Sequence, residues 1–351
     1  MSVSFDIPAV HAVQVDRNTR TLREAILSIL QTSPRLPLPG RGQTLTRWRT
    51  LDALAQADLV LAKLLEPHWD AQAIFADLQV DPAGAAGGTP VTCWAVWAAE
   101  PADAIVRGTR QSDGTLQLNG RKAWCSGAAL VSHALITYID ENDRRGLAAI
   151  ALDAPGVRIT GDGWHGVGMD ATASVDIVLT GVAATPVGPP GAYLSRAGFW
   201  QGGMGIAACW LGGATALARA ARAQAARRPD AHALAHIGAL DVALTTTQAL
   251  MRETAAWVDA HPAADAQWPA FRLRAAAEAC AQTALLHSSR VLGAAPLCRD
   301  ARLARLFADL PVFVRQSHAE RDLAALGESL VTPAPPGEGQ APSDMGAAWS
   351  M

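Results

Sequence analysis

The sequence predicts an α+β protein in which a central β domain stands between a helical N-terminal part and a C-terminal helical bundle. Apolar residues such as Leu51, Leu54 and Leu65 recur at three- and four-residue steps, as an amphipathic helix requires. Short β-like runs follow, and alanine-rich stretches of high helix propensity occupy the rest of the chain. Two segments rich in proline and glycine, Pro82–Pro90 and Pro186–Pro190, separate these three parts.

The two joints define the limits that we expect for each part. The N-terminal helical domain covers residues 1–90, the β domain residues 91–187 and the helical bundle residues 193–327. Residues 328–351 are rich in proline, glycine and small polar residues, so we expect a disordered tail. Four long helices with short connections predict an antiparallel four-helix bundle. These helices are Gly203–Arg228, Ala233–His261, Ala264–Leu292 and Ala301–Leu326.

The β domain is expected to be a compact barrel or sandwich of short strands. The expected strands are Val91–Ala99, Ile105–Arg110, Thr115–Leu118, Ala134–Ile139, Gly146–Leu152 and Ser174–Leu179. Ser112–Gly114 supplies a turn that predicts a hairpin between the second and third of them.

Composition narrows the range of functions. The chain has 351 residues, a formal net charge of −3 and 50% hydrophobic residues, so it can bury a large core and offers no basic surface to nucleic acid. The longest run of low polarity, Gly202–Ala214, is too short to span a membrane, and the N-terminus shows no secretory leader. The five cysteines are scattered, which indicates a reducing compartment and no structural metal site. We therefore expect a cytoplasmic protein.

Two segments of the β domain carry a resemblance to a known family. Asn119–Ala128 reads NGRKAWCSGA and Trp97–Pro101 reads WAAEP. They resemble motifs of the acyl-CoA dehydrogenase family, and the resemblance extends over roughly Leu45–Gly327. It implies bound FAD, with Trp124 covering one side of the flavin ring and Ser126 bonded near its reactive nitrogen. A flat ring in an apolar cleft with an aromatic neighbour and a few polar groups is physically reasonable.

The resemblance implies further contacts with FAD. Ala99 stands where the family has a hydroxyl residue, so only a main-chain contact is expected there. Gly293 resembles the position at which one subunit approaches the partner's flavin, which implies a homodimer or tetramer built through the bundle. The implied cofactor-binding residues are Trp97, Ala99, Glu100, Trp124, Cys125, Ser126 and Gly293. An electron-accepting flavoprotein is a further expected partner.

The catalytic carboxylate of the family has no clear counterpart. The stretch that resembles the family's Tyr-Glu-Gly-Thr loop is Arg315–Asp322, and the alternative position, Arg196–Gly203, contains no acid. We predict His318, or failing that Glu320, as the base, because histidine titrates near neutral pH. His318 also continues the four-residue spacing of an apolar stripe after Val314, which fits a structural histidine as well.

Three functions are compatible with this sequence. The main prediction is an FAD-dependent, acyl-CoA dehydrogenase-like oxidoreductase that desaturates an acyl thioester between its α and β carbons. The second is a flavin-dependent monooxygenase of the same fold, in which His318 and Ser126 assist oxygen transfer. The third is a flavoprotein-like scaffold or partner subunit without turnover. In each case the cavity should form where Trp97–Glu100, Trp124–Ser126 and Arg315–Glu320 converge.

Overall fold

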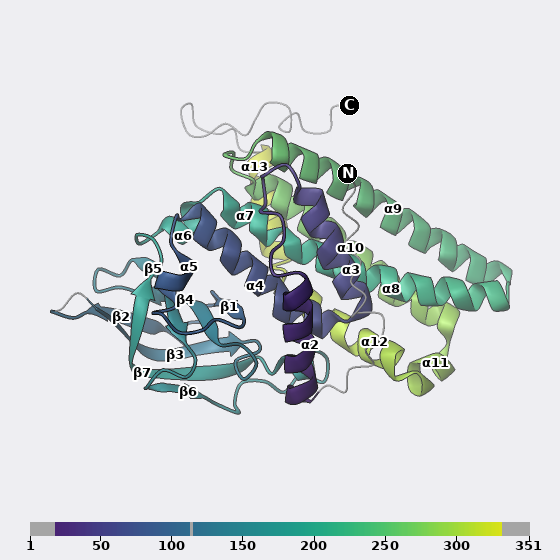
Figure 1. The fold of residues 1–351 in the computed structure, drawn as a ribbon. Coiled ribbons are helices and arrows are strands. Elements are labelled where there is room, and N and C mark those ends of the chain that lie inside the picture. The colour runs from purple at the N-terminus through teal and green to yellow at the C-terminus, as the bar shows by residue number, and fades with distance from the viewer. Residues whose placement is uncertain (1–17, 113–114, 332–351) are drawn as a thin grey trace.

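The computed structural model describes residues 18–112 and 115–331, and it shows helices, then strands, then helices along the chain (Figure 1). The mixed α and β composition agrees with the sequence prediction. The N-terminal helices are α2 (Thr19–Thr32), α3 (Thr44–Ala57), α4 (Leu59–Asp77) and the short α5 (Pro82–Ala85). The helix α4 begins where the carboxylate of Asp58 accepts the main-chain N–H groups of Val60 and Leu61.

Seven strands form one sheet that closes into a small barrel. They are β1 (Trp94–Trp97), β2 (Val106–Arg110), β3 (Leu116–Cys125), β4 (His133–Ile139), β5 (Arg145–Ala151), β6 (Val157–Ile159) and β7 (Val175–Pro186). The order is β1-β4-β2-β3-β7-β5, and β5 also pairs with β4, so no edge remains between them. β1 pairs with β4 in parallel, and β6 pairs with β7 in antiparallel orientation. The sequence pattern did not predict β6. Two residues of the predicted hairpin turn, 113 and 114, lie outside the described residues.

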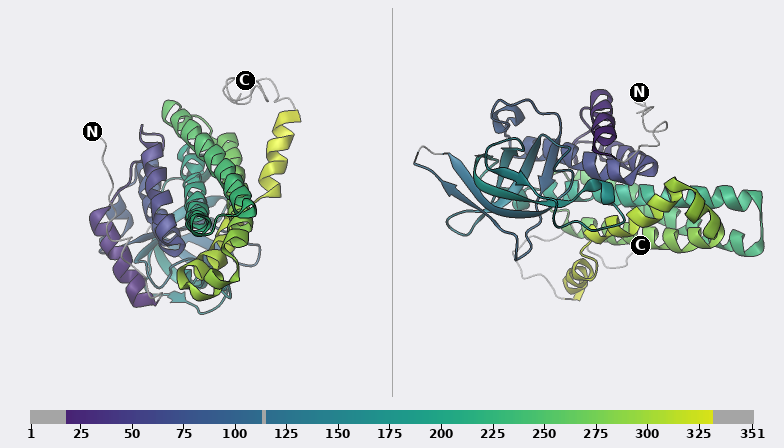
Figure 2. Two further views of the ribbon diagram at one scale, coloured as in Figure 1. Left: turned by 90° about the vertical axis from the view of Figure 1, so that its right-hand side faces the viewer. Right: turned by 90° about the horizontal axis from the view of Figure 1, so that it is seen from below.

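The C-terminal helices follow the barrel in the chain, and the longest of them run beside one another and extend away from it (Figure 2). They are α6 (Ala192–Ser195), α7 (Gly198–Gly203), α8 (Gly205–Arg227), α9 (Ala231–Ala260), α10 (Gln267–Leu292), α11 (Ala294–Arg299), α12 (Ala301–Phe313) and α13 (Glu320–Val331). The first three long helices of the predicted bundle lie close to the predicted ranges. Among the described residues, Gly198–Arg227 is apolar and long enough to cross a membrane, but 83% of its most apolar window is buried in the protein.

The prediction of one continuous helix over Ala301–Leu326 is wrong. The helix α12 ends at Phe313, a 3₁₀ turn follows at Val314–Gln316, and a new helix starts at Glu320. Ala319 adopts a left-handed φ of +42° at this break. His318 therefore lies in a connection and not on a helical stripe. Residues 328–331 were expected in the disordered tail but belong to α13, and residues 332–351 lie outside the described part.

A buried histidine links α4 to the first strand. His68 Nδ1 accepts a hydrogen bond of 3.1 Å from the main-chain N–H of Trp94, so the ring must be neutral at that nitrogen. Burial lowers the pKa of His68 from 6.5 to about 4. This hydrogen bond joins α4 to β1, so the protonation state of His68 affects how the helix and the strand are held together.

We expect this histidine to make the protein less stable in acid. Between pH 6.5 and about pH 4 this histidine is protonated in the unfolded chain but not in the folded protein. The contribution of neutral His68 to the free energy of unfolding is therefore complete above pH 6.5 and is lost as the pH falls to 4. The shift corresponds to about 3 kcal/mol. Urea unfolding of wild type and His68→Asn at pH 7 and pH 4 measures it, because the amide keeps an acceptor but does not titrate. The difference in unfolding free energy between the two proteins should shrink in acid; an unchanged difference would contradict the assignment.

Candidate active site

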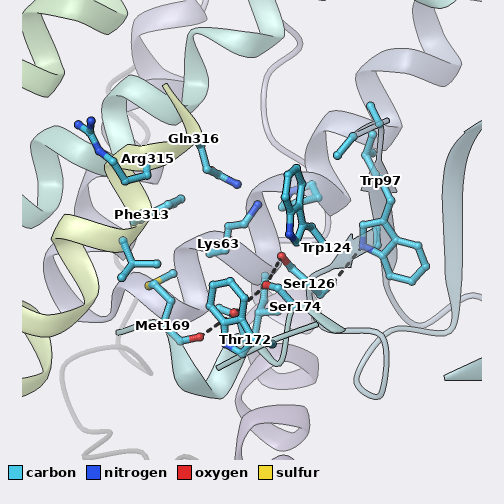
Figure 3. A pocket seen from close by; sticks show the side chains of 18 of the residues that line it. Lys63, Trp97, Trp124, Ser126, Met169, Thr172, Ser174, Phe313, Arg315 and Gln316 are labelled. Atoms are coloured by element: carbon cyan, nitrogen blue, oxygen red, sulfur yellow. Dashed lines mark hydrogen bonds between the residues drawn. The ribbon is translucent and has the colours of Figure 1, made fainter. Parts of the chain in front are cut away.

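A cavity of about 580 Å³ opens between the barrel and the helices (Figure 3). Its walls come from α4, β1, the end of β3, the loop before β7 and the end of α12. The lining residues are Lys63, Leu64, Pro67, Ala95, Val96, Trp97, Ala98, Ala99, Trp124, Ser126, Trp164, Met169, Thr172, Ser174, Val312, Phe313, Arg315, Gln316 and His318. The three segments that we expected to converge therefore all reach one cavity. Its volume is in the range of small-molecule sites.

The backbone of β3 turns Trp124 out of the sheet. The pairing with β7 is irregular between Lys122 and Cys125, and Trp124 adopts a left-handed φ of +58°. Its side chain is 56% exposed, while the side chain of the next residue, Cys125, is fully buried. A non-glycine residue in this conformation costs about 1–2 kcal/mol, and such strain is commonly retained at functional sites. The strained backbone conformation of Trp124 directs its large flat ring into the cavity.

Three hydroxyl groups form a chain along the lower wall. Ser126 Oγ lies 2.7 Å from Ser174 Oγ, which lies 2.9 Å from Thr172 Oγ1. Thr172 Oγ1 donates a bond of 2.7 Å to the carbonyl of Met169. The indole N–H of Trp97 donates to the carbonyl of Ser126 over 3.2 Å. The Ser126 hydroxyl is therefore held in position at the cavity surface (Figure 3).

A lysine on α4 that the sequence analysis did not select also reaches the cavity. Figure 3 shows the Lys63 side chain between Phe313, Gln316 and Trp124. Its pKa is lowered by burial, and the charge of Glu66 opposes this shift. The residue stands within a buried, mostly apolar helix, where sequence alone gives no sign of a site. The signal that could have found it is the rarity of lysine in this chain, which has two in 351 residues.

The predicted base His318 lies at the cavity wall. Its side chain is 58% exposed, and its Nδ1 lies 3.4 Å from a carboxylate oxygen of Asp322. Burial and the nearby Arg321 lower the pKa of His318, while Asp322 opposes them. The second candidate, Glu320, is exposed, starts α13 and is not among the lining residues. The geometry therefore brings His318 to the cavity and leaves Glu320 outside it.

Three of the predicted cofactor-binding residues do not line the cavity. The carboxylate of Glu100 pairs with the guanidinium of Arg145. Cys125 is buried, and its thiol donates to the carbonyl of Lys122 over 3.3 Å. Gly293 ends α10 with a φ of +66° and has open space around its Cα. Their contacts with FAD stay predictions. In contrast, Trp97, Ala99, Trp124 and Ser126 line the same space.

No aspartate or glutamate is among the described residues that line this cavity. Its polar side chains are hydroxyls, an amide and three bases. The described part of the chain also contains no group of three or more His, Cys, Asp and Glu residues that could hold a metal ion. The cavity can therefore accept a flat ligand, bind it with hydroxyl groups and exchange protons through nitrogen bases.

Solved structures with the same architecture were found in a comparison of folds. Dibenzothiophene monooxygenase TdsC from Paenibacillus sp. A11-2, bound to FMN and indole, superposes with a TM-score of 0.74 at 20% identity over 89% of both chains. Methanesulfinate monooxygenase MsuC from Pseudomonas fluorescens gives 0.71 at 20% identity over 90% of both chains. A nitrososynthase from Micromonospora carbonacea var. africana gives 0.68 at 19% identity over 83% of both.

The chain has the acyl-CoA dehydrogenase fold. This architecture agrees with the fold that the motif resemblance implied. The amino sugar nitrososynthase DnmZ of Streptomyces peucetius is 32% identical over 136 residues. This match spans only 36% of the chain and 33% of that enzyme. No protein-family model matches the sequence. The comparison of structures thus shows the acyl-CoA dehydrogenase fold for this chain.

Proposed function

We propose that the protein is a flavin-dependent monooxygenase with the acyl-CoA dehydrogenase fold. The observation that carries this proposal is the absence of a carboxylate among the described lining residues. Desaturation of an acyl thioester requires a base beside the α carbon, and a glutamate serves in the family that the sequence resembles. Oxygen insertion requires no such carboxylate. The cavity therefore favours the second predicted function over the main prediction of α,β-desaturation.

The residues present fit a flavin ring. The exposed indole of Trp124 offers a flat apolar surface, and Ser126 offers a positioned hydroxyl within reach of the same space. The side chains of Trp97 and Trp164 complete an aromatic lining. We propose FMN in place of the FAD that we first expected, since the similar TdsC structure was solved with FMN.

This chain's own residues would hold the ligands and exclude water. When bound, reduced flavin supplies two electrons to dioxygen, so that one oxygen atom enters the substrate and the other leaves as water. Ser126 would orient the ring through its hydroxyl, which Ser174 and Thr172 hold in place. Phe313 and Met169 close the apolar side and limit the water that reaches the reacting atoms.

The expected partners change with this proposal. Oxygen insertion consumes electrons, so a flavoprotein partner would donate electrons and not accept them. The substrate would be a small molecule with an oxidisable atom in place of an acyl thioester. A homodimer or tetramer built through the bundle and a location in the cytoplasm remain part of the proposal.

The purified protein can distinguish the two activities. We expect FMN to bind more tightly than FAD, and we expect butyryl-CoA to leave the oxidised flavin unbleached without oxygen. The reduced, loaded protein should then place ¹⁸O from dioxygen into an oxidisable nitrogen or sulfur compound, and the compounds to test are a primary amine, a thiol and dibenzothiophene. Anaerobic bleaching by butyryl-CoA would restore the desaturation prediction, and failure to bind either flavin would favour the scaffold.

A further inference from the structure

The chain contains far more arginine than lysine. Of 29 lysine and arginine residues, only Lys63 and Lys122 are lysines. Arginine keeps its proton in proteins, whereas lysine can lose one when it is desolvated. Lys63 lines the cavity, and Lys122 lies within the barrel. Arginine therefore supplies nearly every permanent positive charge of the chain, and only Lys63 and Lys122 carry a side-chain amine that can titrate.

The two amines differ in their surroundings. Lys122 Nζ is enclosed in the barrel and donates to the carbonyl and the hydroxyl of Thr137, at 3.0 and 2.7 Å. Lys63 lines the open cavity, and no hydrogen bond or ion pair joins its amine to another of the described residues. An ammonium group among apolar side chains such as Leu64, Met169 and Phe313 is poorly solvated. The Lys63 amine is therefore free to interact with a ligand.

Several charged side chains lie near Glu66, which is one turn after Lys63 on α4. Glu66 follows on the same face of α4, Arg47 comes from α3 and Arg274 from α10. Burial and the neighbouring Asp70 raise the pKa of Glu66 to about 7. Two guanidinium nitrogens of Arg47 and one carboxylate oxygen of Asp70 are buried without a hydrogen-bond partner among the described residues. Such a cluster can take up and release protons near neutral pH.

We propose that Lys63 is the proton-transfer residue of this cavity and acts as the general base toward a substrate whose reacting nitrogen or sulfur carries a proton. The unprotonated amine accepts that proton and becomes an ammonium, and the substrate atom keeps the electron pair that then receives oxygen. Glu66 and the cluster behind it return Lys63 to the unprotonated form. No electrons move in this step. The inference deepens the proposed monooxygenase function and rests on it for the identity of the reaction.

The titratable groups around Lys63 set its protonation. Burial lowers the pKa of Lys63, and negative charge on Glu66 or Cys209 opposes this. Arg315 and His318 face the same cavity from the end of α12. The guanidinium of Arg315 is paired with Glu278, and His318 with Asp322, so both are less available to a ligand than the lysine. The competing role for Lys63 is a permanent ammonium that binds an anionic group.

Competitive acetylation of the amines in the full-length protein across pH 5 to 11 separates these roles without any flavin or substrate. We expect Lys63 to titrate below about 10.4, the ordinary value for lysine, and so to react at pH 7 faster than a free lysine of equal access. The titration midpoint does not depend on access to the cavity. Lys122 is the internal control, since it should react only after unfolding. A Lys63 midpoint at or above 10.4, or no reaction at any pH, would overturn the proposal.

Two variants add a second measurement. Glu66→Gln removes the negative charge that opposes the shift, so the Lys63 midpoint should fall further. Lys63→Arg keeps the positive charge without the titration, so product formation from a primary amine or a thiol should drop about a hundredfold while flavin affinity and melting temperature stay unchanged. Ethylamine should restore part of the rate to Lys63→Ala. Full turnover in Lys63→Arg would refute proton transfer by this residue. If wild type binds no flavin, the proposed function fails, and the labelling midpoint still decides the state of Lys63.

Discussion

Replacing Trp124 with alanine is expected to weaken flavin binding by about ten- to a hundredfold. Stacking of a flat ring on an aromatic side chain contributes about 1–3 kcal/mol, and each 1.4 kcal/mol changes affinity tenfold. The indole is 56% exposed because the irregular end of β3 turns it toward the cavity, so the change removes few contacts within the protein. Quenching of FMN fluorescence during titration measures the affinity.

The matched control for this experiment is Trp124→Gly. Both variants lack the indole, but glycine adopts the φ of +58° without strain. The two variants should bind FMN equally weakly. Trp124→Gly should unfold at a higher urea concentration than Trp124→Ala, because its unfolding free energy should be greater by about 1 kcal/mol. Unchanged FMN affinity in both variants would show that the ring binds elsewhere, and the proposed cofactor position would fail.

Replacing Gly168 with alanine is expected to lower the unfolding free energy by about 3 kcal/mol. A Cβ at this position would lie 1.9 Å from the carbonyl oxygen of Ala308, so the loop before β7 could not approach α12. The next residue depends on the same approach, because the N–H of Met169 donates to the buried carboxylate of Asp309 over 2.6 Å. Met169 would therefore move, and the cavity wall with it.

Urea unfolding and FMN titration of the same variant test this prediction. The control is Gly161→Ala in the preceding loop, where an added Cβ has no neighbour within 4 Å and φ is not left-handed. That change should alter stability by less than about 0.5 kcal/mol and leave FMN binding intact. If Gly168→Ala matches its control in both measurements, the close approach of loop and helix is not needed for the cavity.

The sequence was sufficient to predict the order of helices and strands, because hydrophobic period and helix propensity are local properties. It failed at Ala301–Leu326, where the helical pattern is continuous but the chain breaks after Phe313. Pro311 and the left-handed Ala319 mark that break only when tertiary contacts are known. Closure of the barrel by β5 also depends on contacts between distant segments.

The candidate site was predictable to a similar degree. Trp97, Trp124 and Ser126 were selected from two motifs, and the fold brings them to one cavity with His318. Lys63 was missed because a lysine within an apolar helix gives no local sign of which way it points. Whether a polar group is buried, paired or open to a cavity is decided by packing, and the sequence pattern does not contain that information.

The cavity is lined by segments that lie between Lys63 and His318 in the chain and come from the N-terminal helices, the barrel and the C-terminal helices. A ligand that fills it can therefore bind the native state only, and its binding is coupled to folding of the whole molecule. At a ligand concentration a hundred times its dissociation constant, the native state gains about 2.7 kcal/mol. The melting temperature of the purified protein thus becomes a sensor for cavity ligands, and a thermal-shift screen can identify the substrate without an assay for its product.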